Sequence, residues 1–325
     1  FFKQKTAYEI STRDWSSDVC SSDLAIFRRQ GGANLLIVGQ REDLGASLLA
    51  MAIVSLAAGH DPHPGGALRR PGRFVLLEPA IAEEKPELLL AKLADHLPHE
   101  IEVAGRLGVA ASMERLAAEV QRRIDEQVLD GESVFLVIRD LGRFRELRKD
   151  EGGFGFSFGG EKKAGPASHF NTILKDGPPV GVHTIIWCDS LTNLMRTFER
   201  AAVKEFELRA VFQMSGTDSS QLIDSPAASN LGPQRALFIH EETGTLEKFR
   251  PYAFPTAEWL TTVAERLRAR PQGTPRDRLE PSPAERPSAT TAETPGEETF
   301  GLAGDRKSTR LNSSHEWISR MPSSA

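Results

Sequence analysis

The sequence predicts an α/β fold in which helices cover both faces of a mostly parallel β-sheet. Short runs that are apolar throughout alternate along the chain with longer segments of helical periodicity. Continuously apolar strands are typical of parallel sheets, because their connecting helices pack on both faces. The chain has 325 residues, and its central part is long for one core but normal for a single α/β domain.

The predicted strands and helices follow one another in a regular order. The strands are the apolar runs at 35–38, 74–77, 101–103, 134–138, 184–188, 210–214 and 236–239. The helices are Gly45–Ala58, Glu84–His96 and Ser112–Leu129, and Ser112 is expected to be the N-cap of the last one. Ligands of such sheets bind beyond the carboxyl ends of the strands, so we expect the chemistry there.

The two ends of the chain differ from its middle. Residues 1–24 and 306–325 show no sustained periodicity and resemble translated sequencing-adapter sequence, so we expect both to be artefactual rather than native. Residues 269–305 are rich in Pro, Glu and Thr. They offer too little apolar surface to offset the entropy of ordering, which predicts a disordered tail. The folded module is therefore expected at 25–268.

Composition limits the functional classes. The formal net charge of −5 gives no general attraction to nucleic acid, so a DNA contact would need a local basic surface. No apolar run reaches the roughly 18 residues of a membrane span. Cys20 lies in the first segment, and Cys188 alone cannot form an internal disulfide. We expect a cytoplasmic module without membrane contact of its own, within a parent protein that can still be membrane-anchored.

A glycine-containing stretch follows the first predicted strand. A phosphate-binding loop reads G-x-x-x-x-G-K-S/T, with a lysine for the β/γ-phosphates and a hydroxyl for Mg²⁺. Here Gly39 and Gly45 are separated by five residues, Ala46 replaces the lysine, and Ser47 keeps the hydroxyl. The Glu42–Asp43 pair adds negative charge where a polyphosphate would lie. The stretch is thus a compromised nucleotide site or, alternatively, a plain strand-to-helix turn.

A second candidate position follows the run at 134–138. A Walker B strand ends in an aspartate that organises Mg²⁺ and a glutamate that positions the attacking water. Asp140 is the candidate metal-organising acid, together with Ser47, but Leu141 stands where the glutamate belongs. The alternative interpretation of Asp140 is a capping residue at the end of a strand.

The segment at 208–239 combines two apolar strands with a polar connection that contains Arg209, Phe212, Gln213, Ser215, Asp218, Ser219, Ile223, Asp224, Ala228, Leu231 and Gly232. In these residues it resembles the closing part of FtsK/SpoIIIE motor domains, with one residue fewer between Ser215 and Asp218. We expect Asp218 or Ser219 to cap a short helix, and Pro226 to open the next helical turn. The resemblance spans about 34–250 and places all the pieces in the family's order.

The resemblance implies a RecA-like P-loop NTPase fold and, for the family, ring hexamers that bind ATP between subunits and pump double-stranded DNA. Relatives drive conjugation and type VII protein secretion. Large members carry several modules in tandem, and this chain is most similar to a degenerate C-terminal one. Arg209 is the candidate trans-acting finger for a neighbouring subunit's phosphates, or alternatively an anchor for a carboxylate at the strand start.

Three functions follow from this resemblance. The first is a degenerate module of a larger DNA-translocating motor, with nucleotide binding weak or lost and a role in assembly or regulation. The second is an active translocase, in which Lys175 or Lys204 supplies the missing lysine. The third is a partner- or substrate-binding module of a type VII secretion-like motor. Expected partners are other ATPase modules or ring subunits and double-stranded DNA, with a secretion substrate less favoured.

Overall fold

The computed structural model of the chain describes residues 25–62, 70–79, 88–149 and 164–269. These residues belong to the first of the chain's two compact units, Phe1–Pro275. The segments expected to be artefactual and all but the first residue of the predicted tail lie outside the described residues. Those three assignments therefore remain predictions.

One eight-stranded sheet organises the described residues, in the order β3-β2-β4-β5-β1-β6-β7-β8. The strands are β1 (Leu35–Val38), β2 (Gly72–Leu77), β3 (Ile101–Ala104), β4 (Ser133–Ile138), β5 (Val182–Cys188), β6 (Leu208–Phe212), β7 (Ala236–His240) and β8 (Thr245–Phe249). Neighbours from β3 to β6 are parallel, whereas β7 and β8 are added antiparallel at one edge. The predicted mostly parallel sheet is confirmed.

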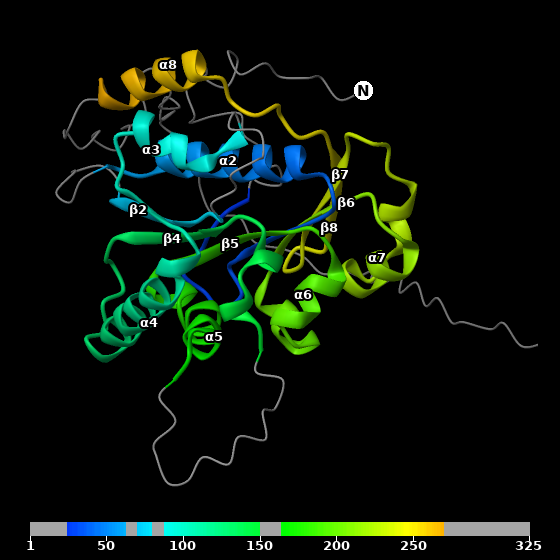
Figure 1. Ribbon diagram of the computed structural model, residues 1–325, viewed down its shortest axis with the longest axis horizontal. Coiled ribbons are helices and arrows are strands. Elements are labelled where there is room, and N and C mark those ends of the chain that lie inside the picture. The colour runs from blue at the N-terminus through cyan, green and yellow to red at the C-terminus, as the bar shows by residue number, and fades with distance from the viewer. Residues whose placement is uncertain (1–24, 63–69, 80–87, 150–163, 270–325) are drawn as a thin grey trace, which may run out of the picture. The chain divides into compact units, whose positions relative to one another are not determined.

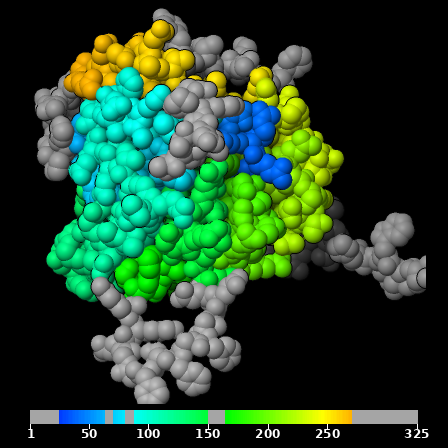
Figure 2. Space-filling view, in the orientation of Figure 1, coloured from blue at the N-terminus to red at the C-terminus, as the bar shows by residue number. Residues whose placement is uncertain are grey.

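Helices cover both faces of this sheet (Figure 1). One face carries α2 (Glu42–Gly59), α3 (Leu93–His96) and α8 (Ala257–Arg268), and the other carries α4 (Val109–Asp125), α5 (Pro166–Asp176), α6 (Leu191–Thr197) and α7 (Gly216–Ile223). Figure 2 shows α8 lying over the segment around α3, where Arg268 donates a hydrogen bond of 2.9 Å to the His96 carbonyl.

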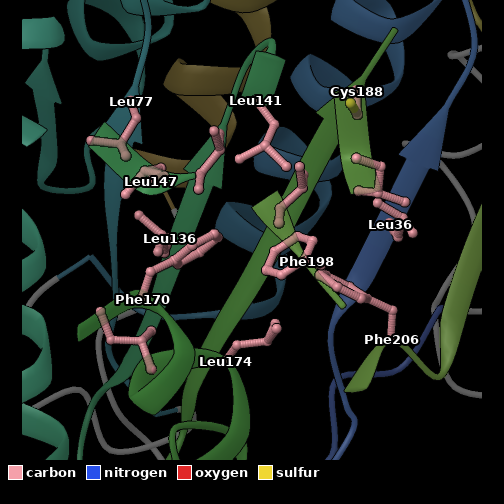
Figure 3. Packing of buried hydrophobic residues seen from close by; sticks show 14 of the residues in the cluster. Leu36, Leu77, Leu136, Leu141, Leu147, Phe170, Leu174, Cys188, Phe198 and Phe206 are labelled. Atoms are coloured by element: carbon pink, nitrogen blue, oxygen red, sulfur yellow. The ribbon is translucent and has the colours of Figure 1, made fainter. Parts of the chain in front are cut away.

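The strands supply side chains to two separate cores because successive residues point to opposite faces. Leu36 and Val38 of β1 belong to the core between the sheet and α4 to α7. Leu35 and Ile37 belong to the core between the sheet and α2, α3 and α8. Figure 3 shows part of the first core, where Leu36 of β1 lies near Phe198 and Phe206. The continuous apolar runs in the sequence reflect this burial on both sides.

Three predicted helix boundaries are wrong. The helix α2 begins at Glu42 rather than Gly45, so the acidic pair lies in its first turn.

The helix α4 begins at Val109 and ends at Asp125, with Gly108 as its N-cap. Ser112 is instead a buried residue inside it, because a 3₁₀ turn at Arg106–Gly108 leads straight from β3 into the helix. Of the predicted helix at 84–96, the described part is a 3₁₀ turn at Leu90–Lys92 followed by α3.

The helix α2 is the one helix of the described residues that is long and apolar enough to cross a membrane. It lies against the sheet, where Leu49, Ala50 and Ile53 are fully buried in the core. A central helix of an α/β sheet passes the same test of length and composition, so the match is a weak indication of a membrane span.

A buried histidine gives the fold a predictable dependence on pH. His183 of β5 stacks on Phe135 with ring centroids 5.8 Å apart, and its Nδ1 lies 2.9 Å from the Ala33 carbonyl oxygen. Burial lowers the pKa of His183 to about 4, against the partial compensation of the Ala33 bond, and the nearby charges of Arg29 and His60 lower it further. The ring is therefore neutral in the folded protein at neutral pH.

Below pH ~6.5, the ordinary pKa of histidine, His183 binds a proton in the unfolded chain but stays neutral in the folded chain. The free energy of unfolding should therefore fall as the pH drops from about 6.5 to 4, by up to roughly 3 kcal/mol from this group. Denaturant titrations at several pH values should show a shallower fall for His183→Leu than for the wild type. The same change at His169, half-buried on α5, is the control, and parallel profiles for His183→Leu and wild type would contradict the assignment.

Candidate functional site

The carboxyl ends of β1, β4 and β5 meet at one edge of the sheet, where ligands of such folds bind. The residues that leave these strands are Gly39 after β1, Arg139 and Asp140 after β4, and Asp189 after β5. The helix α2 begins at the same edge. This edge is therefore the candidate site, and it contains the predicted residues Gly39 and Asp140.

The glycine stretch does not form a loop of the predicted length. Only Gly39–Arg41 separate β1 from α2, so Gly45, Ala46 and Ser47 lie within the helix and are buried. The Gly45 amide donates to the Arg41 carbonyl at 2.9 Å. The Ser47 hydroxyl donates to the Asp43 carbonyl at 2.6 Å. The groups expected to hold phosphate and Mg²⁺ are thus engaged in the hydrogen bonds of the helix.

Both glycines are accounted for by close contacts with aromatic side chains. Gly39 has φ 155°, and a Cβ there would lie 2.5 Å from the Phe212 Cβ. A Cβ on Gly45 would lie 2.5 Å from Trp187 Nε1. The same indole nitrogen donates to the Gly39 carbonyl at 3.1 Å. Trp187 of β5 and Phe212 of β6 therefore fill the space beside the glycines, and this packing alone requires both residues to be glycine.

A buried arginine occupies the first position after β4. Arg139 is 1% exposed, and its two terminal nitrogens donate to Glu78 at 2.6 Å and to Glu42 at 2.7 Å. Glu78 also accepts the backbone N–H groups of Leu90 and Ala91 at 2.9 and 2.8 Å. This ion-pair triad joins the ends of β2 and β4 to the start of α2. Arg139 was not among the predicted site residues, although a charge directly after an apolar run was a visible signal.

Asp140 has the geometry of a turn residue. Its backbone is left-handed, with φ 58°, and its carboxylate accepts a 2.6 Å bond from Arg143 Nε. Burial raises the pKa of Asp140, the charges of Asp189 and Glu42 raise it further, and the bond and charge of Arg143 oppose the rise. Leu141, in the place expected for a catalytic glutamate, is fully buried in the core.

The end of β5 adds a fourth carboxylate, Asp189, with its own donors. Asp189 accepts two bonds from Asn193 Nδ2, at 2.8 and 2.9 Å, and one from Ser190 Oγ at 3.1 Å. Cys188 beside it is buried, and burial raises the pKa of its thiol to about 12. A thiol with such a pKa is not a nucleophile at neutral pH, so Cys188 is a core residue.

Arg209 lies inside the molecule, toward the amino end of β6. Its guanidinium donates to the carbonyls of Leu222 and Val203, at 2.9 and 3.3 Å, and to the carboxylate of Glu241. The residue is 6% exposed. These contacts match the anchor interpretation, because both terminal nitrogens already have partners within the chain. A trans-acting role for Arg209 remains an untested prediction.

The segment with the family resemblance folds as a strand, a helix, a turn and a second strand. Ser215, rather than Asp218 or Ser219, caps α7 by accepting the Asp218 N–H. Ser219 is instead buried and hydrogen-bonds across to the following 3₁₀ turn, Pro226–Asn230. Pro226 opens that turn, as predicted. The polar residues of this segment are thus needed to shape the connection between β6 and β7.

Lys175 and Lys204, the suggested substitutes for the missing loop lysine, lie near the amino end of β1, whereas the candidate site lies at the carboxyl end of this strand. The Asn34 side chain, just before β1, donates to the carbonyls of Leu174 at 3.0 Å and Glu205 at 2.8 Å. Lys175 and Lys204 are the immediate chain neighbours of those two residues. Both therefore belong to the amino end of β1, whereas the glycines follow its carboxyl end.

No protein-family model matches the chain, and no curated protein matches it. Solved structures with a partial likeness to this chain include three that each have a TM-score below 0.5. The cytoplasmic domain of the type VII secretion ATPase EccC from Thermomonospora curvata is 15% identical, with a TM-score of 0.49 over 75% of this chain and 29% of that chain. The pCW3 conjugation coupling protein TcpA with ATPγS is 12% identical, with a TM-score of 0.49 over 72% of this chain and 64% of that chain. The DNA-packaging ATPase B204 of Sulfolobus turreted icosahedral virus is 12% identical, with a TM-score of 0.45 over 70% of this chain and 100% of that chain.

This chain spans less than two thirds of the first two proteins. Likeness at this level gives no information about substrate or activity. The RecA-like α/β fold class rests on the sheet itself, in which β5 separates β1 from β4 and helices cover both faces.

The contact between Gly45 and Trp187 predicts that alanine substitutions at two glycines of α2 change the free energy of unfolding differently. Gly45→Ala should lower the free energy of unfolding by about 1–3 kcal/mol, because the new methyl group overlaps the buried indole. Gly59→Ala at the end of the same helix meets no atom within 4 Å and should be neutral or stabilising by up to about 1 kcal/mol. Urea titrations followed by tryptophan fluorescence measure both, and equal effects would contradict the proposed packing.

The Arg139 triad predicts a large and specific loss of stability. Arg139→Met leaves Glu78, whose side chain is 4% exposed, as a buried charge without its cation, at a cost of about 3–5 kcal/mol. Adding Glu78→Gln should recover part of this loss, because the uncompensated charge disappears. Arg122→Met on the exposed face of α4 is the control and should change stability little. Wild-type stability of Arg139→Met in chemical denaturation would contradict the assignment.

Proposed function

We propose that this chain is a degenerate FtsK/SpoIIIE-like ATPase module of a larger motor, in which an internal ion-pair network stands in place of the nucleotide. The observation that carries the proposal is the buried Arg139, held between Glu42 and Glu78 at the ligand-binding edge of the sheet. Such a module would contribute to assembly or regulation rather than to hydrolysis. ATP and Mg²⁺ would bind weakly or not at all.

The start of α2 supports this proposal through its charge. A helix N-terminus binds phosphate because its free N–H groups and its dipole favour negative charge. Here Glu42 and Asp43 already provide negative charge in the first turn. Both carboxylates are already paired, Glu42 with Arg139 and Asp43 with Arg41, so neither arginine is free to bind a polyphosphate. A polyphosphate would have to compete with Glu42 for Arg139, whose partner Glu78 is itself buried.

Neither of the lysines suggested as a substitute for the missing loop lysine lies at this edge. Ala46 is fully buried in α2, and Lys175 and Lys204 belong to the opposite edge of the sheet. This favours the degenerate module over the active translocase. The partners that suit such a module are other ATPase modules of its parent protein or ring subunits, with double-stranded DNA as the polymer moved. A cytoplasmic location fits this role.

Calorimetry and turnover assays on the whole chain test the proposal. With millimolar ATP and Mg²⁺ we expect no binding heat and no phosphate release above background. Ala46→Lys should not restore either signal, because the new lysine would replace a fully buried methyl group and should instead destabilise the fold. Robust hydrolysis by the wild type, or micromolar ATP affinity, would overturn the proposal.

A further inference from the structure

We propose that Glu207, His240 and Glu242 form a binding site for a divalent transition-metal ion of the Zn²⁺ class, at the amino end of β6 rather than at the carboxyl ends of β1, β4 and β5. Each residue offers one ligand atom, and these atoms all lie within 4.8 Å of one another. Glu207 and His240 are half-buried and Glu242 is exposed. An imidazole together with carboxylates is a ligand set that Zn²⁺ accepts in proteins.

The backbone holds the three ligand residues in a fixed arrangement. Glu207 directly precedes β6, and His240 is the last residue of β7, opposite Leu208 in the antiparallel ladder. The Glu241 amide donates to the Glu207 carbonyl at 2.9 Å, which fixes the segment that leads to Glu242. Glu207 and His240 therefore lie at two paired strand ends, and Glu242 follows in the short turn from β7 to β8, so little ordering would be needed on binding.

The present partners of the two glutamates are cationic or hydrogen-donating. Arg28 forms an ion pair of 2.8 Å with Glu242. The Gln30 amide donates to Glu207 at 3.2 and 3.4 Å and to Glu242 at 3.5 Å. The two carboxylates thus already bind one cation, Arg28, and one neutral donor, Gln30, from the segment before β1. A metal ion would displace Arg28, whose side chain is 50% exposed and free to move into water.

Gln30 can supply a fourth ligand. Its amide nitrogen and oxygen exchange places by a half-turn of the side-chain amide, which would direct the oxygen toward an ion. His240 Nδ1 accepts a long bond of 3.3 Å from the Thr243 N–H, a weak contact that a metal would readily replace. The resulting set of one nitrogen and three oxygens favours Zn²⁺ over Mg²⁺, which prefers an all-oxygen, partly hydrated octahedron.

Such a site would connect three segments that are distant in sequence. Gln30 lies before β1, Glu207 before β6, and His240 and Glu242 at the β7–β8 turn. A bound ion would replace the exposed Arg28–Glu242 pair with coordinate bonds and so clamp the antiparallel hairpin to the start of the sheet.

Titration of the whole chain with Zn²⁺ in a calorimeter tests the site. We expect one equivalent to bind the wild type, and His240→Ala to weaken that binding at least tenfold. His169→Ala, a half-buried histidine on α5, is the matched control and should bind like the wild type. Arg28→Ala should bind more tightly than the wild type, because the competing cation is gone. Co²⁺ should give visible absorption bands with the wild type that His240→Ala lacks.

A folding defect in His240→Ala is controlled by Glu242→Gln, which alters an exposed side chain and should also weaken Zn²⁺ binding. Circular dichroism of each metal-free variant establishes that it is folded. The proposal is wrong if the wild type does not bind Zn²⁺, or if His240→Ala and Glu242→Gln both keep wild-type affinity. Equal affinity of Arg28→Ala and the wild type would show that the ion does not displace Arg28, and would overturn the coordination described.

Discussion

The ion-pair triad of Arg139 with Glu42 and Glu78 determines the local structure at the edge of the sheet that contains the candidate site. A guanidinium that is almost fully buried must have its charge balanced nearby, since the cost of removing a charge from water is several kcal/mol. Glu78 provides this balance from the end of β2, and Glu42 provides it from the first turn of α2. The position of α2, the short connection from β1 and the turn after β2 are all consistent with this single requirement.

Aromatic side chains of β5 and β6 pack at the same edge of the sheet. A nucleotide-binding loop needs glycines so that its backbone can approach phosphate, whereas here the glycines admit Trp187 and Phe212. The indole even takes the carbonyl of Gly39 as its hydrogen-bond acceptor. Burial of apolar area and the ion pairs of Arg139 thus stabilise this edge through contacts within the chain.

The strands could be predicted because burial on both faces leaves an unmistakable apolar run, as in β1 and β4. The strand β8 was missed because Thr245–Phe249 alternates between half-buried and exposed residues at an edge and has no such run. The start of α2 was misplaced because a glycine pattern has two explanations, ligand approach and aromatic contact, and sequence cannot separate them. Arg139 was overlooked for a related reason. Its partners lie 61 and 97 residues away, and only the fold brings them together.

For the residues of the candidate site, the position in the fold could be predicted from the sequence, but the contacts could not. The position of Asp140 at the end of β4 followed from the apolar run before it. Its engagement by Arg143 depends on a left-handed backbone that no sequence pattern specified. The cap of α7 shows the same limit, because Ser215, Asp218 and Ser219 all suit an N-cap and the chain geometry selects Ser215.

The strand order also determines when during synthesis this domain can fold. The first strand, β1, lies between β5 and β6, and Leu35 pairs with Ile185 on one side and Leu208 on the other. A ribosome that has made only the first half of the domain has therefore produced a central strand without either neighbour. Until β6 emerges, the apolar β1 and α2 remain exposed to other unfinished chains. Native pairing over such a sequence separation is slow, so this protein should depend on chaperones that shield nascent chains.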